Sequence, residues 1–388
     1  MGLVKSEWME AQEQGWSAIA DKRVCTRCVD DKALKATLKA QALSGRCDYC
    51  GRRGKIASVE ALQEALYATV WTYYHEPTDA GVPWDGGFII DPIDIEEVLH
   101  ELGFDGHPDL LADIVDSDMG NGWVAAANGH WATVHEHEVL LSSWSSFEEI
   151  IKHKTRFHFG QAGQTFTAGP QEIEPSRMLG VLGEQLRPYI RTIKAGTVTY
   201  RVRVRGTRET WKPCASELGA PPPNVARAGR MNPAGIPYLY MAFDVATALR
   251  ETGVSSQTAG EVFVASFEVV EPLMVIDLTR LLRPPSVFDI VRKREREGAL
   301  FAHGFVNAIS RPVTKNGREH IEYVPSQVVC EYLAQAFRPK KDARLSGLVF
   351  PSSVHENGKN LVVFPSDRGP DQSFDRVEFR RAARTKRR

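Results

Sequence analysis

The chain has 388 residues, of which 43% are hydrophobic and 25% charged, and these are ordinary proportions for a globular protein. Its length exceeds what one small core needs and suggests two or three domains. The 48 Lys and Arg nearly cancel the 49 Asp and Glu, so the overall charge excludes a general attraction to nucleic acid or to a membrane surface.

The sequence contains no segment typical of membrane insertion or export. No apolar run reaches the roughly 18 residues that a spanning helix needs. The N-terminus lacks the basic and then apolar order of a signal peptide. We therefore expect a cytoplasmic protein with no membrane partner.

Four of the six cysteines form two Cys-x-x-Cys pairs, Cys25 with Cys28 and Cys47 with Cys50. Four thiolates at this spacing are typical of a tetrahedral structural zinc site. With sulfur in all four positions, such a site holds the fold and leaves no place for water or substrate. Two redox dithiols are the alternative, but nothing nearby resembles a thioredoxin unit. We predict a zinc-knuckle module at residues 1–55.

Basic residues surround these cysteines. They can meet phosphates or simply offset the negative charge of the thiolates. The residues concerned are Lys22, Arg23, Arg27, Arg46, Arg52 and Arg53.

A helical domain is predicted for residues 56–170. Apolar residues at three- and four-residue steps predict a first helix with Ser58 as its N-cap. A second helix is predicted to start at Asp91-Pro92 and to stop at Gly103, and a third to cover 110–115. A capping-box pattern at 146–149 predicts a fourth helix beginning at Ser146.

Three tryptophans, Trp123, Trp131 and Trp144, are expected to fill the core of this helical domain. Residues 158–175 are rich in Gly, Gln, Thr and Pro, which is typical of a linker. We assign 171–195 to the linker and a lead-in helix.

The second half, residues 196–368, is predicted to be rich in strands. Strands that follow one another with few helices between them favour a mixed or antiparallel sheet, and hence an α+β class. The predicted strands cover 197–205, 236–242, 262–270, 273–278, 321–324, 345–350 and 361–364, with a helix at 244–251. Residues 369–388 are predicted to be a basic, solvated tail, for which nucleic acid is the less favoured partner.

Within this half, Arg201, Arg230, Tyr240 and Glu251 follow one another at a spacing suited to gripping a phosphorylated nucleoside. Arg230 follows Gly229, and a later Val-Pro-Ser sequence supplies Ser326 in a strand-like context. This set resembles the RES domain, a family named for its Arg, Glu and Ser. One departure is Met231, which stands where the family usually has Trp.

The resemblance implies a fold like that of ADP-ribosyltransferases and an enzyme that consumes NAD. The double cysteine knuckle and the helical tract, over about 20–160, resemble the HEPN-like region that precedes some RES domains. NAD would be a substrate that is cleaved, since no glycine-rich dinucleotide fingerprint of the Rossmann type occurs near these residues.

The expected roles follow from residue chemistry and from the resemblance. Arginine suits a diphosphate because its planar guanidinium donates two parallel hydrogen bonds, so Arg201 and Arg230 would clamp the NAD phosphates. Glu251 would bind a ribose hydroxyl and stabilise the oxocarbenium charge. Tyr240 offers a ring on which nicotinamide could stack, and a hydroxyl for the ribose or amide.

Further residues are assigned to the same site. Tyr238 lies two residues before Tyr240 and so would face the same side of a strand. Asn232 joins the NAD-binding set. Ser326 would donate a hydrogen bond on the nicotinamide side, and Ser352 and Ser353 could share or replace that role.

The sequence therefore predicts an NAD-cleaving toxin or defence effector, by hydrolysis or phosphorolysis, with a protein antitoxin or inhibitor as a possible partner. One alternative is a protein ADP-ribosyltransferase. Another is a zinc-containing nucleic-acid-binding protein or ribonuclease, although HEPN nucleases need an Arg followed four to six residues later by His. Only Arg296 and His303, outside the helical tract, approach that pattern. A third is a zinc-stapled adaptor that has lost activity.

Overall fold

The computed structural model describes residues 8–385, with the exception of residues 10, 13, 121, 161–170, 312–316 and 367–373. It divides into two compact units that are interleaved along the chain. The first comprises Met1–Val139 with Arg283–Leu300, and the second Leu140–Leu282 with Phe301–Arg388. Helices α6 (Glu136–His153) and α10 (Lys293–Ser310) each have residues in both units.

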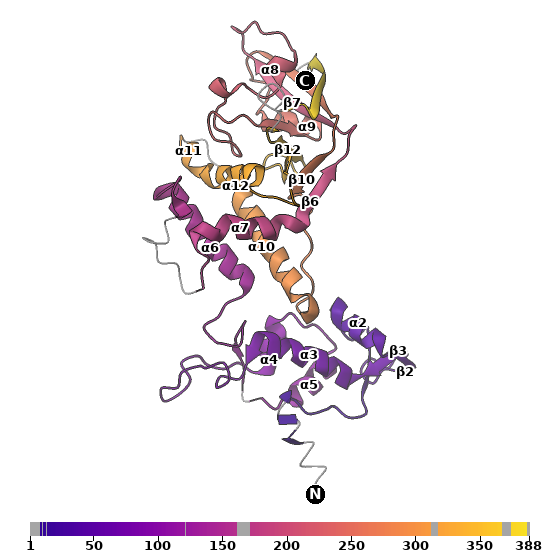
Figure 1. Ribbon diagram of the computed structural model, residues 1–388. Helices are drawn as coiled ribbons and strands as arrows, with labels where there is room; N and C mark the ends of the chain where they lie inside the picture. Colours follow the sequence, from indigo (N-terminus) through magenta and orange to yellow (C-terminus); the bar gives the residue numbers. More distant parts are fainter. Residues whose placement is uncertain are drawn as a thin grey trace. The chain divides into compact units, whose positions relative to one another are not determined.

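The first unit combines a small antiparallel sheet with helices (Figure 1). Its sheet has the order β1-β3-β2, and a two-stranded pair joins β4 and β5. The elements are β1 (Arg23–Cys25), α2 (Lys32–Ala40), β2 (Leu43–Arg46), β3 (Arg53–Ser58), α3 (Val59–Tyr73), β4 (Tyr74–His75), α4 (Ile95–Glu101), α5 (Pro108–Asp116), β5 (Val124–Ala125) and η4 (Ile290–Arg292).

Helix α3 is central to the first unit because its apolar side chains, including Leu62 and Leu66, are fully buried. Leu34 and Leu38 of α2 lie in the same core cluster, and so does Trp123. Burial of such side chains contributes about 1.5–3 kcal/mol each.

The second unit contains an eight-stranded mixed sheet of order β13-β9-β7-β8-β12-β11-β10-β6. Strands β10 and β11 pair in parallel, and the other neighbours are antiparallel. The strands are β6 (Ile190–Ile193), β7 (Val198–Arg205), β8 (Leu239–Ala242), β9 (Glu261–Val269), β10 (Leu273–Asp277), β11 (Gly347–Pro351), β12 (Lys359–Val363) and β13 (Val377–Arg384). The predicted α+β class is confirmed.

Helices of the second unit bury an aromatic core that includes Trp144, Phe147, Phe301 and Phe305. They are the later part of α6, α7 (Pro175–Leu186), η2 (Arg187–Tyr189), α8 (Ala215–Leu218), η3 (Pro223–Val225), α9 (Val245–Glu251), the later part of α10, α11 (Glu319–Glu322) and α12 (Val324–Gln335).

Several predicted elements are confirmed. Ser58 caps α3 by accepting a hydrogen bond from Ala61 N, and Gly103 follows α4 with a φ of +75°. The predicted helix at 244–251 is α9, capped by the Asp244 side chain. The predicted third and lead-in helices are α5 and α7.

Other predictions were wrong. Helix α4 begins at Ile95 with Asp94 as its N-cap, because Ile93 pairs with Trp123 in an isolated β-bridge. Helix α6 begins at Glu136, so the capping-box pattern at Ser146 lies inside a helix, where the Ser146 hydroxyl donates to Glu172.

The three tryptophans do not share one core. Trp123 lies in the core of the first unit and Trp144 in that of the second, whereas Trp131 packs on a small cluster formed by Ala80, Val82, Val124 and Ala126. The predicted strand at 321–324 is helical, since α11 and α12 meet there.

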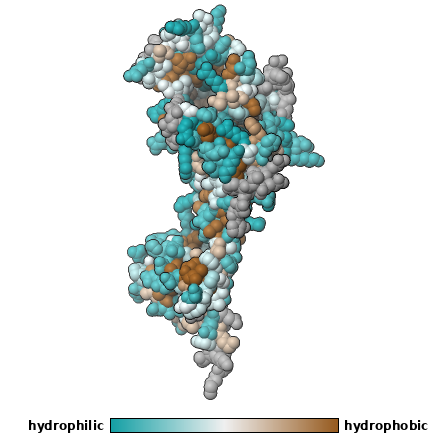
Figure 2. All heavy atoms as spheres, turned by 90° about the vertical axis from the view of Figure 1, so that its left-hand side faces the viewer, coloured by the Kyte–Doolittle hydropathy of each residue, from teal (hydrophilic) through white to brown (hydrophobic). Residues whose placement is uncertain are grey.

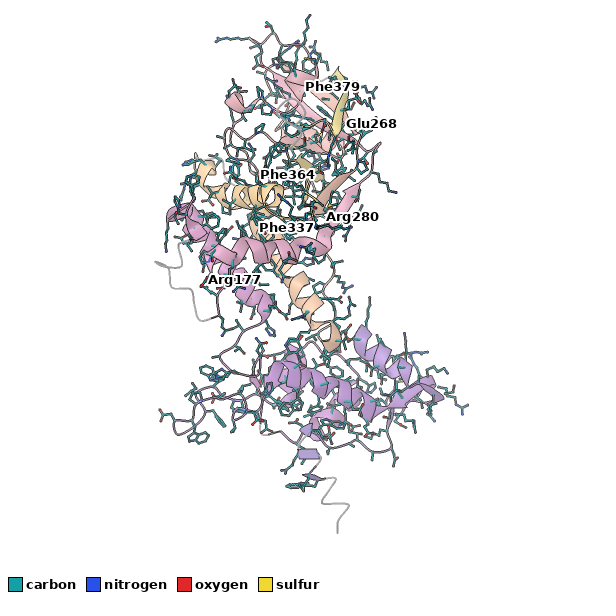
Figure 3. The ribbon with its side chains drawn as sticks, in the orientation of Figure 1. Arg177, Glu268, Arg280, Phe337, Phe364 and Phe379 are labelled. Atoms are coloured by element: carbon teal, nitrogen blue, oxygen red, sulfur yellow. The ribbon has the colours of Figure 1, made fainter. Side chains whose placement is uncertain are left out.

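Part of the predicted basic tail is β13, which pairs with β9 as the edge strand. Phe379 packs its ring 5.7 Å from Phe267, and Arg380 donates to Glu268 at 3.0 Å (Figure 3). Apolar and basic side chains of this segment therefore both contribute to the edge of the sheet.

Most of the surface seen in Figure 2 is hydrophilic, with hydrophobic side chains gathered in a few patches. Among the residues that the structure describes, no helix combines the length and the apolar character that crossing a membrane would require.

Gly347 lets β11 approach β12 closely. An added Cβ would stand 2.2 Å from the Val362 carbonyl oxygen, which is backbone and cannot turn away. We expect Gly347→Ala to lower the free energy of unfolding by about 1–3 kcal/mol, measured by urea denaturation. The matched control is Gly180→Ala on α7, where an added Cβ meets nothing within 4 Å; it should be neutral or raise stability by up to about 1 kcal/mol. Equal effects of the two changes would contradict this explanation.

Candidate active site and metal centre

Strands β7 and β8 diverge at the candidate active site. They share a single register pair, Tyr200 with Ala242, whereas β7 pairs with β9 along its whole length. Beside that pair lies a cavity of about 580 Å³. This volume falls within the range of small-molecule sites.

The cavity brings together five residues that the sequence predicted: Arg201, Arg230, Tyr240, Glu251 and Ser353. They come from β7, the loop before β8, β8 itself, the end of α9 and the loop after β11. These segments are far apart along the chain, so only the fold of the sheet assembles them.

Arg201 is half-buried, and its guanidinium has no ion-pair partner among the described residues. Its Nη1 atom is out of contact with solvent and has no hydrogen-bond partner among the described residues. Burial, together with the neighbouring Arg203, lowers the pKa of Arg201 to about 10, so the guanidinium is still protonated at neutral pH. An unpaired buried charge is costly, and an anion in the cavity would relieve that cost.

Arg230 provides a second cation in the same cavity. Its guanidinium nitrogens lie 3.4 and 3.3 Å from the carbonyl oxygens of Ser310 and Arg311, at the end of α10. Across the described ranges, no carboxylate lies within ion-pair distance of it. Its charge is therefore available to a ligand.

Asn232 and Tyr240 hold the loop that carries Arg230. The Asn232 amide nitrogen lies 2.9–3.1 Å from three carbonyl oxygens of that loop. The Tyr240 hydroxyl donates to Asn232 Oδ1 at 2.7 Å and accepts from Met231 N at 3.0 Å. Glycine at position 229 allows the loop to pack closely on Asn232, because an added Cβ would stand 2.7 Å from Asn232 Oδ1.

Ser326 lies at the start of α12, not in a strand, and it does not line the cavity. Its hydroxyl donates to the Arg230 carbonyl oxygen, and Gln327 Nε2 donates to the Gly229 carbonyl oxygen at 2.7 Å. The first turn of α12 therefore holds the backbone of the loop that carries Arg230 through two hydrogen bonds. A strand was expected here because Ile, Tyr and Val precede the proline.

Tyr238 and Tyr240 pack against the same core cluster, as the strand period predicts. However, only Tyr240 lines the cavity. The Tyr238 ring lies 5.1 Å from that of Phe364, which is labelled in Figure 3.

Glu251 ends α9, and the loop after β11 holds its carboxylate. Its Oε1 atom accepts from Ser352 Oγ and from Asn360 Nδ2, each at 2.6 Å. The Ser352 hydroxyl in turn accepts from the backbone N–H groups of Val354 and His355. Glu251 Oε2 accepts no hydrogen bond from the part of the chain that is described, so one carboxylate oxygen is fixed and the other is open to a ligand.

A second set of contacts holds the same loop to the start of α9. Thr247 Oγ1 donates to Asp244 Oδ2 at 2.6 Å and lies 2.7 Å from His355 Nδ1. Since Thr247 has one hydroxyl hydrogen, His355 is the donor in the second contact. Gly358 leaves room for the Thr247 hydroxyl, because an added Cβ at position 358 would stand 2.7 Å from Thr247 Oγ1.

The lining residues that were missed from the sequence include Tyr200, Arg250, Tyr323 and Asn360. Tyr200 and Arg250 adjoin predicted residues, so adjacency was an available signal. Nothing in the sequence pointed to Asn360, which reaches Glu251 through the pairing of β12 with β8.

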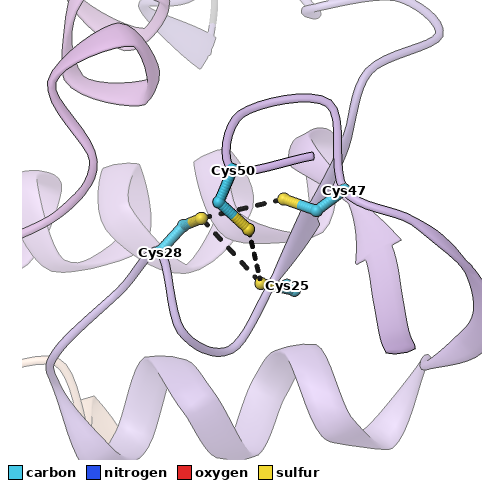
Figure 4. A group of neighbouring side chains, drawn as sticks. All are labelled: Cys25, Cys28, Cys47 and Cys50. Carbon is cyan, nitrogen blue, oxygen red and sulfur yellow. Dashed lines mark hydrogen bonds between the residues drawn. The ribbon is translucent and has the colours of Figure 1, made fainter. Parts of the chain in front are cut away.

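The four knuckle cysteines converge in the first unit (Figure 4). Their sulfurs lie within 4.8 Å of one another, with contacts of 3.6–3.9 Å. A tetrahedron with zinc–sulfur bonds of about 2.3 Å has edges of about 3.8 Å, so the geometry fits zinc. Burial raises the pKa of Cys28, whereas the Arg52 backbone N–H lowers that of Cys50 to about 7.

Two known domain families match the chain. Residues 199–381 match the family described as the RES domain, and residues 40–165 match HEPN/RES N-terminal domain 1. Together these matches cover most of the chain. The chain contains a RES domain. Members of the RES family are in general NAD-acting enzymes. No curated protein matches the chain.

The cysteine cluster predicts about one zinc per chain. We expect elemental analysis to find it, and Cys47→Ser to lose it together with stability of the first unit, because binding of a structural metal contributes directly to folding. Cys214→Ser is the control, since Cys214 is exposed and lies outside the cluster. Less than about half an equivalent of zinc in the parent protein would contradict a four-thiolate site.

The Tyr240 hydroxyl predicts a stability effect that is separate from catalysis. We expect Tyr240→Phe to lower the free energy of unfolding by about 1–3 kcal/mol, because it leaves Met231 N and Asn232 Oδ1 without their partner. Tyr332→Phe is the control, since the Tyr332 hydroxyl has no hydrogen bond within the described residues; it should change stability by less than about 0.5 kcal/mol. Urea denaturation of both variants checks this, and equal losses would contradict it.

Proposed function

We propose that the RES domain cleaves the bond between nicotinamide and ribose in NAD. The observation that carries this proposal is the unpartnered Nη1 of Arg201, which lines one cavity with Arg230 and Glu251. Two cations suit a diphosphate, and a carboxylate with one open oxygen suits the sugar.

The reaction balances without a redox step. The bond between ribose C1 and the nicotinamide nitrogen breaks, and its electron pair stays on nitrogen, which loses its positive charge. A bond forms between C1 and an oxygen of water or of inorganic phosphate, and the acceptor's proton is released if the acceptor is water. The products are nicotinamide and ADP-ribose or its phosphate ester.

Within this proposal, Glu251 stabilises the positive charge that develops on the ribose. A carboxylate does so best when its position is fixed before the reaction, since no reorganisation is then needed. Ser352 and Asn360 fix one oxygen of Glu251. Ser326, Asn232 and the Tyr240 hydroxyl act one step further away, by positioning the loop of Arg230.

The Tyr240 ring is the proposed surface for nicotinamide, because the ring lines the cavity while its hydroxyl is used within the protein. Ser353, unlike Ser326 and Ser352, lines the cavity. The cysteine centre takes no part in the step, because four thiolates leave no open position on a zinc ion.

Loss of NAD arrests a cell, so we propose that the protein acts as a toxin or defence effector. A protein antitoxin or inhibitor would then control it.

The proposal predicts that purified protein converts NAD to nicotinamide. We expect Glu251→Gln to reduce kcat by about 100-fold or more, because a fixed stabilising group is worth about 10²–10³ in rate. We expect Arg201→Gln to act mainly through KM. Chromatography of nicotinamide and ADP-ribose measures both.

Glu268→Gln is the control, since Glu268 lies on β9 and pairs with Arg380, away from the cavity lining. Growth of a host that expresses each variant gives a second readout, which also detects activity that an inhibitory state hides in vitro. Intact NAD after prolonged incubation, with a Glu251→Gln strain growing no better than the parent strain, would remove the proposal.

A further inference from the structure

The zinc-knuckle region has an excess of positive charge that the rest of the chain conceals. Residues 22–55 contain ten Lys and Arg but only three acidic residues, although the whole chain has a net charge of −1. The cations are Lys22, Arg23, Arg27, Lys32, Lys35, Lys39, Arg46, Arg52, Arg53 and Lys55, and the acids are Asp30, Asp31 and Asp48.

The cysteines do not account for this excess. Four thiolates around one Zn²⁺ carry two net negative charges, which two of the seven surplus cations would balance. Without a metal, Cys50, whose pKa is lowered to about 7, adds at most one negative charge. The region is therefore strongly basic in either state.

The acidic residues of this region are already in use. Asp31 caps α2, and the Asp48 side chain accepts from Arg23 N at 2.7 Å. Asp30 pairs with Lys35. Outside the region, Asp113 pairs with Lys22. These contacts leave most of the cations without a carboxylate.

The hairpin of β2 and β3 concentrates three of these cations on one face. Arg46 stands directly opposite Arg53 in the register, and Lys55 follows two residues later on the same face. All three are exposed. Within the described residues none of them has an ion-pair partner, and Arg46 Nε donates instead to the Gly51 carbonyl oxygen at 2.9 Å.

Like charges directly opposite each other on two strands destabilise the pair. The fold nevertheless places Arg46 against Arg53 and adds Lys55 beside them. A polyanion bound to these three cations would offset their mutual repulsion. We call Arg46, Arg53 and Lys55 the basic hairpin.

We propose that the basic hairpin binds the phosphate backbone of double-stranded nucleic acid. A two-stranded ribbon fits the major groove of a duplex, and arginine donates two parallel hydrogen bonds to a phosphate. Single strands are held by stacking on exposed aromatic rings, and described residues 20–58 expose none. Leu43 is the one large apolar side chain exposed there, which is too little to insert into a lipid surface.

Backbone contacts alone carry no sequence information. The inferred binding is therefore independent of base sequence and sensitive to salt, because each neutralised phosphate releases counterions. It does not depend on NAD cleavage by the RES domain, so the two proposals can fail separately.

The test uses the full chain and a fluorescently labelled 24-base-pair DNA duplex of arbitrary sequence. Fluorescence anisotropy measures the binding constant over a series of salt concentrations. We expect a Kd of about 10⁻⁴–10⁻⁶ M near physiological salt. The triple variant Arg46→Gln, Arg53→Gln, Lys55→Gln should weaken binding at least about tenfold and reduce the slope of log K against log salt by about 3.

The control is Arg208→Gln, Lys340→Gln, Lys341→Gln, which removes three exposed cations from the second unit and should leave binding unchanged. Circular dichroism and zinc content establish that both triple variants are folded.

Three outcomes would overturn the proposal. One is no binding by the parent protein at low salt. Another is equal weakening by both triple variants, which would mean a general charge effect or binding elsewhere. The third is binding to vesicles containing anionic lipid, or to a labelled single strand, that is as tight as binding to the duplex.

Discussion

The Arg201 guanidinium, which has no ion-pair partner among the described residues, is the group on which the candidate site depends. Arg201 directly follows the one register pair that β7 and β8 share, and it lines the cavity beside that pair. A continuous ladder there would fill the opening and close the cavity. The same divergence of strands that costs backbone hydrogen bonds therefore produces the binding space.

Some residues around Arg201 face the cavity, and other residues hold these cavity-facing residues in position. Arg230 and Glu251 face it, but each depends on groups that do not. The loop of Arg230 is tied by Asn232 and by the first turn of α12. The carboxylate of Glu251 is tied by a hairpin loop whose own shape comes from the Ser352 hydroxyl. Two flexible side chains thus become fixed without being paired to each other.

The sequence predicted what depends on local chemistry. The Ser58 cap, helix α9 and the two cysteine knuckles each need only a few neighbouring residues. The order of Arg201, Arg230 and Glu251, together with the resemblance to the RES family, selected residues that share one cavity. It failed where the outcome depends on distant partners. Ser146 matched a capping box but lies inside α6, because that helix starts ten residues earlier, at Glu136. Asn360 could not be found, since its contact with Glu251 exists only after β12 has paired with β8.

The net charge of the whole chain likewise differs from the local charge of its parts. The net charge of −1 excludes a general attraction to polyanions, yet that value is an average over parts with unlike compositions. At physiological salt the screening length is about 8 Å, so a phosphate near the β2–β3 hairpin responds to the cations within that distance and hardly at all to acidic residues elsewhere in the chain. The local arrangement of charge, like the local arrangement of Arg201 and its neighbours, decides what each surface can bind, and the composition of the whole chain does not.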